Sequence, residues 1–158
     1  MIIKKLFLSF FTLFLLSFFS TTSAGALTFE KLPLAQKSQQ WSVQVEEASM
    51  EKELAQPEKG KFHTYSLKIN KIGEDVDSVQ VYLYRNEPNS NTRFSLVSCP
   101  PSAPCSKEDS ELAKQMNDGH PYLFSNFLLA EKATELEVEI VWTGNKEGRL
   151  MKETFIFK

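Results

Sequence analysis

Residues 134–142, TELEVEIVW, decide the fold class of this 158-residue chain, because apolar and acidic side chains alternate along them. The apolar positions, which would share one side of an extended strand, are Leu136, Val138, Ile140 and Trp142. The acidic positions of the opposite side are Glu135, Glu137 and Glu139. A period of two is typical of a strand with one buried face and one solvated face. The stretch therefore predicts a strand of an antiparallel sheet.

Six further segments carry the same alternation, less regularly in the fourth and fifth of them. They are residues 39–47, 63–70, 78–85, 93–99, 122–130 and 152–158. Connections rich in Asn, Gly, Pro and Ser separate several of these runs, as turns do. About seven short strands predict an all-β, antiparallel β-sandwich. The strand number and spacing resemble an immunoglobulin-like sandwich in architecture only, because the Cys…Trp…Cys pattern of antibody domains is absent.

One segment breaks the strand pattern and predicts a short helix that crosses between the sheets. In SKEDSELAKQMNDG, residues 106–119, Ser106 can cap the helix together with Asp109, and Gly119 can close its end. Two apolar residues four positions apart would face the core, Leu112 and Met116.

The N-terminus has the three parts of a secretory signal peptide. Two lysines are followed by the apolar run 6–19 and then by small residues, and Ala24-Gly25-Ala26 fits a cleavage site. We expect cleavage after Ala26, with a cut after Ala24 as the alternative. An uncleaved anchor is the other interpretation, but the apolar run is shorter than the ~20 residues that a spanning helix needs.

Removal of residues 1–26 leaves 132 of the 158 residues, the size of one domain. We assign residues 27–38 to a leader or first edge strand and residues 39–158 to the sandwich. The removed segment takes two of the 18 basic residues and none of the 20 acidic residues, so the mature net charge is −4. This charge argues against nucleic acid or an anionic membrane as the main partner. Only the signal peptide would contact the membrane, and only transiently.

The signal predicts a secreted, extracellular protein, or a periplasmic one if the source has two membranes. Its basic start and its cleavage site suit a bacterial exporter.

The two cysteines, Cys99 and Cys105, lie in the single stretch SCPPSAPC. In an oxidising compartment a nearby pair normally forms a disulfide, which would here fix the shape of a small Pro-rich loop. Free thiols, a metal site and a redox pair are the alternatives. Two cysteines alone make a poor zinc site, and their spacing is wider than C-x-x-C.

Two surfaces are candidates for binding. Tyr82 and Tyr84 share the outward side of their strand beside Arg85, and exposed tyrosines are good contact surface for a protein or a sugar. The alternative is that both rings lie under the helix or the far sheet. The second candidate is the cysteine loop, whose binding residues would be Pro100, Pro101, Ser102 and Pro104. A stiff loop of this kind suits an inhibitor of a secreted protease, because preorganisation lowers the entropy cost of binding.

The acidic side of residues 134–142 could bind calcium or a basic partner. We expect instead a solvated outer face, in which Lys68 and Lys152 on neighbouring strands pair with the glutamates. A straight strand does not wrap an ion, so no metal site is predicted.

Catalytic motifs are absent from the sequence. The two histidines, His63 and His120, have no local partner that suggests catalysis, and no cofactor is expected. The sequence therefore favours a secreted, non-enzymatic binding or accessory domain for an extracellular or cell-surface partner. The alternatives are a protease inhibitor acting through the cysteine loop, and a small hydrolase or metal-binding protein using a histidine with carboxylates.

Overall fold

The computed structural model describes residues 27–85, 87, 90, 92–97, 106–144 and 148–158. In these residues it contains eight strands and one helix, α2 (Ser106–Asn117). The strands are β1 (Leu34–Lys37), β2 (Trp41–Glu47), β3 (Phe62–Lys71), β4 (Val76–Tyr84), β5 (Arg93–Ser95), β6 (Tyr122–Ala130), β7 (Leu136–Gly144) and β8 (Leu150–Phe157). The signal-peptide assignment falls outside the described residues.

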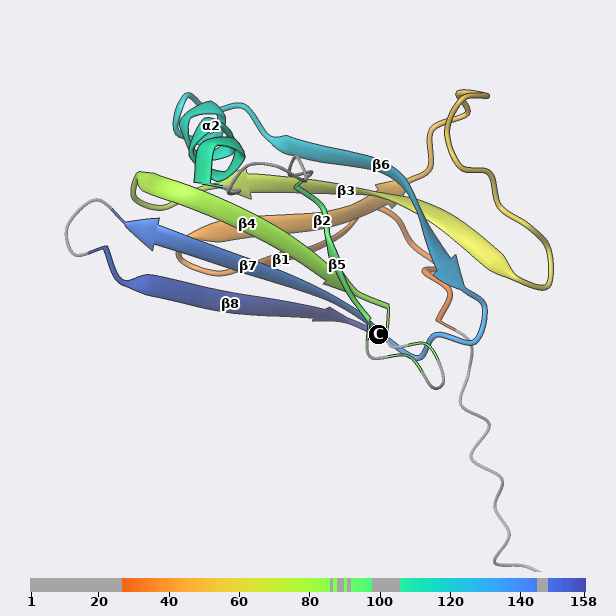
Figure 1. Cartoon of the computed structure of the whole chain (residues 1–158). Coiled ribbons are helices and arrows are strands. Elements are labelled where there is room, and N and C mark those ends of the chain that lie inside the picture. Colours follow the sequence, from red (N-terminus) through yellow and green to blue (C-terminus); the bar gives the residue numbers. More distant parts are fainter. Residues whose placement is uncertain (1–26, 86, 88–89, 91, 98–105, 145–147) are drawn as a thin grey trace, which may run out of the picture.

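Two four-stranded antiparallel sheets form the protein, in the orders β1-β2-β3-β6 and β5-β4-β7-β8. Figure 1 shows them as two stacked layers, with α2 at one end. The predicted all-β architecture of antiparallel sheets is confirmed, and so is the predicted helix between strands of different sheets. Of the described residues of the predicted strand 93–99, Arg93–Ser95 form β5 and pair with β4.

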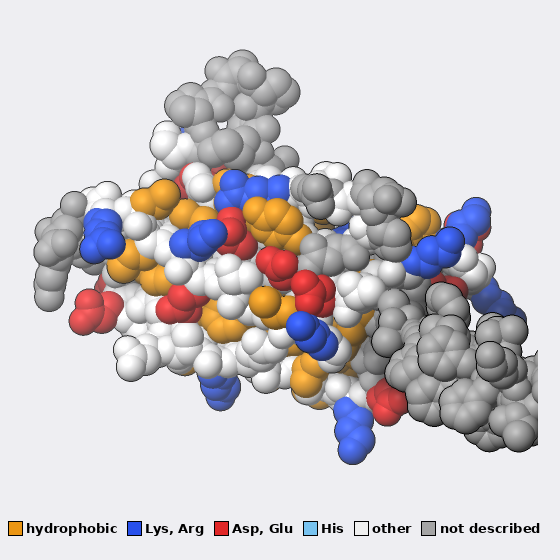
Figure 2. All heavy atoms as spheres, turned by 90° about the horizontal axis from the view of Figure 1, so that it is seen from below, with side chains coloured by type: hydrophobic (Ala, Val, Ile, Leu, Met, Phe, Trp, Pro, Cys, Tyr) orange, Lys and Arg blue, Asp and Glu red, His pale blue; other side chains and the backbone are white. Residues whose placement is uncertain are grey.

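The alternation places polar side chains on the outside of these layers. On the face drawn in Figure 2, acidic and basic side chains stand among small hydrophobic areas. Such a mixture is typical of a surface that faces water.

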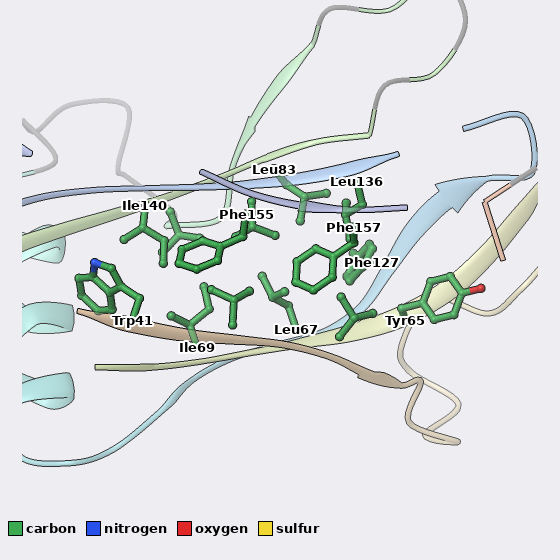
Figure 3. Close-up of a cluster of buried hydrophobic side chains, with 14 of the residues drawn as sticks. Trp41, Tyr65, Leu67, Ile69, Leu83, Phe127, Leu136, Ile140, Phe155 and Phe157 are labelled. Carbon is green, nitrogen blue, oxygen red and sulfur yellow. The ribbon is translucent and has the colours of Figure 1, made fainter. Parts of the chain in front are cut away.

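The core fills the space between the two sheets (Figure 3). The inward side chains of β7 that the alternation predicted, Leu136, Val138 and Ile140, are fully buried. Trp41 of β2 packs edge-on against Trp142 of β7, with ring centroids 5.5 Å apart. Leu112 and Met116 of α2 are buried as predicted, and they join this core. The helix therefore contributes apolar surface to the same core as both sheets.

Helix α2 ends as the sequence predicted and begins differently. Gly119 has a φ of +86°, and the amides of Gly119 and His120 donate to the carbonyls of Met116 and Gln115. These two bonds form a Schellman motif, which a glycine in the left-handed region permits. Asp109 does not cap the helix start, because its buried side chain turns toward β4.

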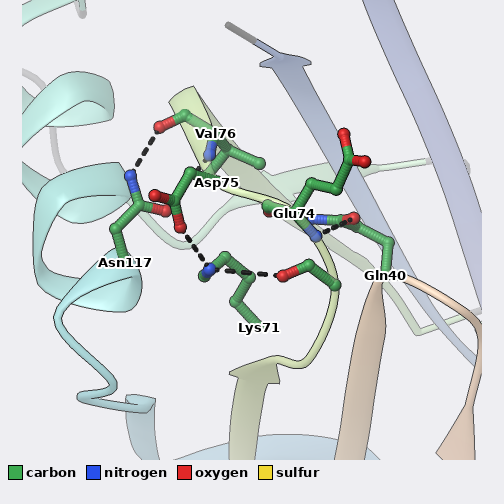
Figure 4. Close-up of polar contacts among 7 residues, drawn as sticks. Gln40, Lys71, Glu74, Asp75, Val76 and Asn117 are labelled. Carbon is green, nitrogen blue, oxygen red and sulfur yellow. Dashed lines mark hydrogen bonds and ion pairs between the residues drawn. The ribbon is translucent and has the colours of Figure 1, made fainter.

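The turn between β3 and β4 carries the chain from one sheet to the other, and two amide side chains hold it (Figure 4). Gln40 donates from Nε2 to the carbonyl of Glu74 at 2.7 Å and accepts from the amide of Glu74 at 3.1 Å. Asn117, the last residue of α2, makes the same two-way contact with Val76, at 2.8 and 3.1 Å. Each amide thus satisfies both the backbone N–H and the C=O of one residue at this crossing.

A second amide clamp orders the long connection between β2 and β3. Asn126 is buried within β6, in the left-handed region with a φ of +51°, at an irregularity in the register of β3 with β6. It accepts from the amide of Ser49 at 2.7 Å and donates to the carbonyls of Ser49 and Ala55, each at 2.9 Å. The connection is therefore held onto the sheet.

We predict that Gly73→Ala destabilises the protein by about 1–3 kcal/mol, because the new methyl group overpacks the turn. A Cβ at this position would lie 2.2 Å from Oε1 of Gln40 and 2.9 Å from the carbonyl oxygen of Gln39. The free energy of unfolding in urea measures the effect. The control is Gly144→Ala, whose Cβ would meet the end of the flexible Met151 side chain among the described atoms, at 3.2 Å. Equal losses in the two variants would contradict this account of the turn.

Candidate functional site

The outer face of the β5-β4-β7-β8 sheet is built from rows of cross-strand neighbours. Gln80 of β4 lies opposite Val141 of β7, which lies opposite Lys152 of β8. The register also places Tyr82, Glu139 and Thr154 in the next row. Side chains in such rows lie about 5 Å apart, so they interact directly.

Glu139 is the buried centre of this face, and its side chain is only 8% exposed. Arg93 of β5 donates from Nη2 to one carboxylate oxygen, and Lys152 lies 3.0 Å from the other. Burial by itself would raise the pKa of Glu139, but the hydrogen bonds and charges of Lys152 and Arg93 outweigh it and lower this pKa below 4.5.

The predicted solvated stripe of glutamates is therefore wrong at Glu139, which is enclosed by two cations. Lys152 forms an ion pair with Glu139 as expected, but Lys68 cannot, because it lies on β3 in the other sheet. Glu135 pairs with Lys158 at 3.3 Å. Within the described residues, no cluster of three or more His, Cys, Asp or Glu side chains could hold a metal ion.

Tyr82 connects this carboxylate to helix α2. The guanidinium carbon of Arg93 lies 3.3 Å from the centre of the Tyr82 ring, in a cation–π contact. The Tyr82 hydroxyl donates to Oε1 of Gln80 at 2.9 Å, and Nε2 of Gln80 donates to the buried Asp109 at 2.5 Å. We call this chain the polar ladder; its members are Asp109, Gln80, Tyr82, Arg93, Glu139 and Lys152.

Arg85, the third residue of the predicted tyrosine surface, has its contacts within the protein. It pairs with Glu87 at 2.9 Å, donates to the carbonyl of Leu128 at 3.0 Å and lies over the ring of Phe94 at 4.2 Å. Tyr82 is covered by Arg93, as described above. Tyr84 lines an open hollow on the described surface.

The hollow has a volume of about 420 Å³ and lies beside the polar ladder. Its lining comes from four strands and consists of Gln80, Tyr84, Arg93, Glu139, Val141, Leu150, Met151 and Lys152. Leu150 and Met151 are exposed large hydrophobic residues. The hollow therefore offers an aromatic ring, apolar surface and two cations that share one buried carboxylate.

The two histidines do not form one site. His63 lies near the start of β3, whereas His120 precedes Tyr122, which pairs with Ile69 near the other end of β3. Six residues of extended strand separate these ends by about 20 Å. His63 lines a separate hollow of about 370 Å³ with Glu47, and no ion pair joins the two in the described structure.

The cysteine loop falls outside the described residues. The disulfide between Cys99 and Cys105, and a binding role for residues 100–104, stay predictions.

Sequence reasoning singled out Tyr82, Glu139 and Lys152 as outward-facing residues, but it did not connect them into a ladder. Two of its members, Glu139 and Lys152, could be found from the alternation, because both point outward on strands joined by a short connection. Arg93 and Asp109 carry no such signal, since their partners lie 46 and 29 residues away along the chain.

These features define a two-sheet β domain whose outer face carries a charged hollow. Residues 25–158 match the model of a family described as YozF-like secreted protein, and the chain belongs to this family. The protein is accordingly a secreted one. It is 52% identical over 142 residues to YozF of Bacillus subtilis (strain 168), itself described as uncharacterized; the match covers 88% of this chain and 86% of the relative. No solved structure matches.

Within the described part of the chain, no helix has the length and apolar character needed to cross a membrane.

We predict that Glu139→Gln lowers the free energy of unfolding by about 1–3 kcal/mol at neutral pH, because it weakens two charged hydrogen bonds to a buried acceptor. Because the folded state lowers the pKa of Glu139, its stabilisation is present above pH 4.5 and is lost as the pH falls through the folded pKa. The wild type should therefore lose more stability on acidification than the variant. Urea unfolding at several pH values measures this difference.

The control is Glu53→Gln, at an exposed position of the β2–β3 connection. It should leave both the stability and its pH dependence close to those of the wild type. Parallel pH profiles for the wild type and Glu139→Gln would contradict the assigned role of Glu139.

Proposed function

We propose that this secreted protein is a non-enzymatic binding domain for an extracellular or cell-surface partner, and that the partner docks in the hollow beside the polar ladder. The observation that carries the proposal is the composition of that hollow. An aromatic residue, an arginine and exposed aliphatic side chains meet there. Tyrosine and arginine are enriched at the energetic centres of protein interfaces.

The polar ladder supports this proposal because it preorganises the hollow. Arg93 is held by a carboxylate on one side and an aromatic ring on the other, so binding would cost little side-chain entropy at this residue. Arg93 and Lys152 share the single charge of Glu139, which leaves a net positive charge among the three. A partner with an acidic or hydrogen-bond-accepting group suits this arrangement.

The absence of catalysis remains part of the proposal. The separation of His63 from His120 supports it, because neither histidine can assist the other. A hydrolytic activity of the purified protein that His63→Ala abolishes would overturn it.

We further infer that the likeness to immunoglobulin domains is limited to architecture. Both have two stacked sheets of short antiparallel strands. An immunoglobulin constant domain places its first, second, fifth and fourth strands in one sheet. Here the first three strands are adjacent and the sixth completes the sheet.

The experiment is capture of the partner by biotin-labelled protein from cell-surface and culture-medium fractions of the producing organism, followed by titration of the purified partner. Tyr84→Ala should weaken binding by at least about tenfold, which is the loss expected when a central aromatic contact is removed. The matched control is Leu123→Ala, at a 61% exposed residue of β6 in the other sheet. Equal affinities for the two variants would show that the hollow is not the site.

A further inference from the structure

Strand β8 is a free sheet edge, and it differs from the other edges that the structure describes. In Figure 1 it is the outermost strand of its sheet, at the bottom of the view. It pairs with β7 on one side, and no described strand pairs with its other side. Its eight residues contain no proline and no bulge. An unpaired edge of this kind is a template for a further strand.

The three other edges carry features that oppose strand addition. β1 has four residues and β5 has three, so each offers few backbone groups. β6 is longer, but its register with β3 is irregular where Asn126 takes a positive φ. Short edges and bulges are two of the devices by which proteins prevent edge pairing. Among these edges, β8 alone lacks them.

One contact shows which backbone N–H and C=O groups of β8 face away from β7. Gln36 of β1 donates from Nε2 to the carbonyl of Ile156 at 2.6 Å, so this carbonyl faces away from β7. In an antiparallel strand the N–H and C=O of one residue point to the same side, and the direction reverses at each residue. The free groups are therefore those of Leu150, Lys152, Thr154 and Ile156.

Apolar side chains lie along the same edge. Of the six exposed large hydrophobic residues among those described, three belong to β8: Leu150, Met151 and Ile156. Leu150 is 67% exposed and Ile156 is 42% exposed. A strand added to β8 would cover them.

We infer that a second copy of this chain adds to β8 in antiparallel fashion, with the two-fold axis at Thr154, and joins two four-stranded sheets into one of eight strands. The register of such a pairing is set by the charges that it brings together. An axis at Lys152 or at Glu153 sets like charges directly opposite each other, which is destabilising. An axis at Thr154 pairs two threonines, which attract.

The register about Thr154 also uses the whole edge. Lys152 lies opposite Ile156 of the second copy, and Leu150 lies opposite Lys158 of the second copy, so the lysine stems cover both exposed aliphatic residues. On the inner side, Met151 lies opposite Phe157 of the second copy. Gln36 gives up its contact with Ile156 when the new strand arrives. The inference goes beyond the proposed binding role and has a different readout, the oligomeric state.

The first test is disulfide trapping in the secreted full-length protein. In the proposed dimer the two Thr154 Cα atoms face each other at about 5.5 Å, within bridging distance, whereas the two Ile156 Cα atoms lie about 14 Å apart. Thr154→Cys should therefore form a covalent dimer at least about tenfold faster than Ile156→Cys. Peptide mass spectrometry identifies bridges between two copies of residue 154 and separates them from bridges through the natural cysteines.

The second test is sedimentation equilibrium over a wide concentration range. The wild type and Thr154→Ala should dimerise, and Thr154→Lys should stay monomeric, because it places two lysines opposite each other on the axis. Within one copy the new lysine lies opposite Glu139, so the fold is retained. A monomeric wild type with equal trapping at both cysteine positions would overturn the inference. So would a photocrosslinker at residue 154 that captures only a different protein.

Discussion

The fold depends on how the chain passes from one sheet to the other between β3 and β4. At this crossing, the amide of Gln40 binds the backbone N–H and C=O of Glu74, and the amide of Asn117 binds those of Val76, the first residue of β4. Gln40 lies in the β1–β2 turn and Asn117 ends α2, so the contact brings together three segments that are distant in sequence. Gly73 lacks a side chain where Gln40 approaches most closely. This junction sets the position of β4, and with it the position of the whole second sheet.

On the outer face of that second sheet, a buried polar group also has its partners within the protein. Glu139 can be buried because Arg93 and Lys152 both reach it, and an unpaired carboxylate there would be strongly destabilising. Arg93 comes from the short edge strand β5, and Tyr82 holds it in place. The polar ladder thus ties four strands and α2 together across the outer face of the sheet. The same contacts shape the hollow to which we assign binding.

Membership of a family of secreted proteins places the domain outside the cell, where it must remain folded without cytoplasmic chaperones. Within the residues described, three features keep the domain folded. They are the two amide clamps, the buried ion-paired carboxylate, and the core that the two sheets share with the helix. Two surfaces stay open to other molecules: the hollow around Tyr84 and the free edge of β8. They lie on the same sheet, so a partner in the hollow and a second copy at the edge would act on neighbouring surfaces.

The sequence by itself determined the strands and the helix, because period-two alternation and helix-end residues are local signals. They depend on neighbours along the chain and not on the tertiary fold. It identified the inward residues of β7 and the closing Gly119 for this reason. The tertiary structure decided which strands are neighbours, and therefore that Lys68 lies away from Glu139 while Arg93 reaches it. It also decided that Tyr82 and Arg85 are engaged internally and that Tyr84 stays accessible. Pairings between residues far apart along the chain depend on sheet order and on where connections cross, and local periodicity contains neither.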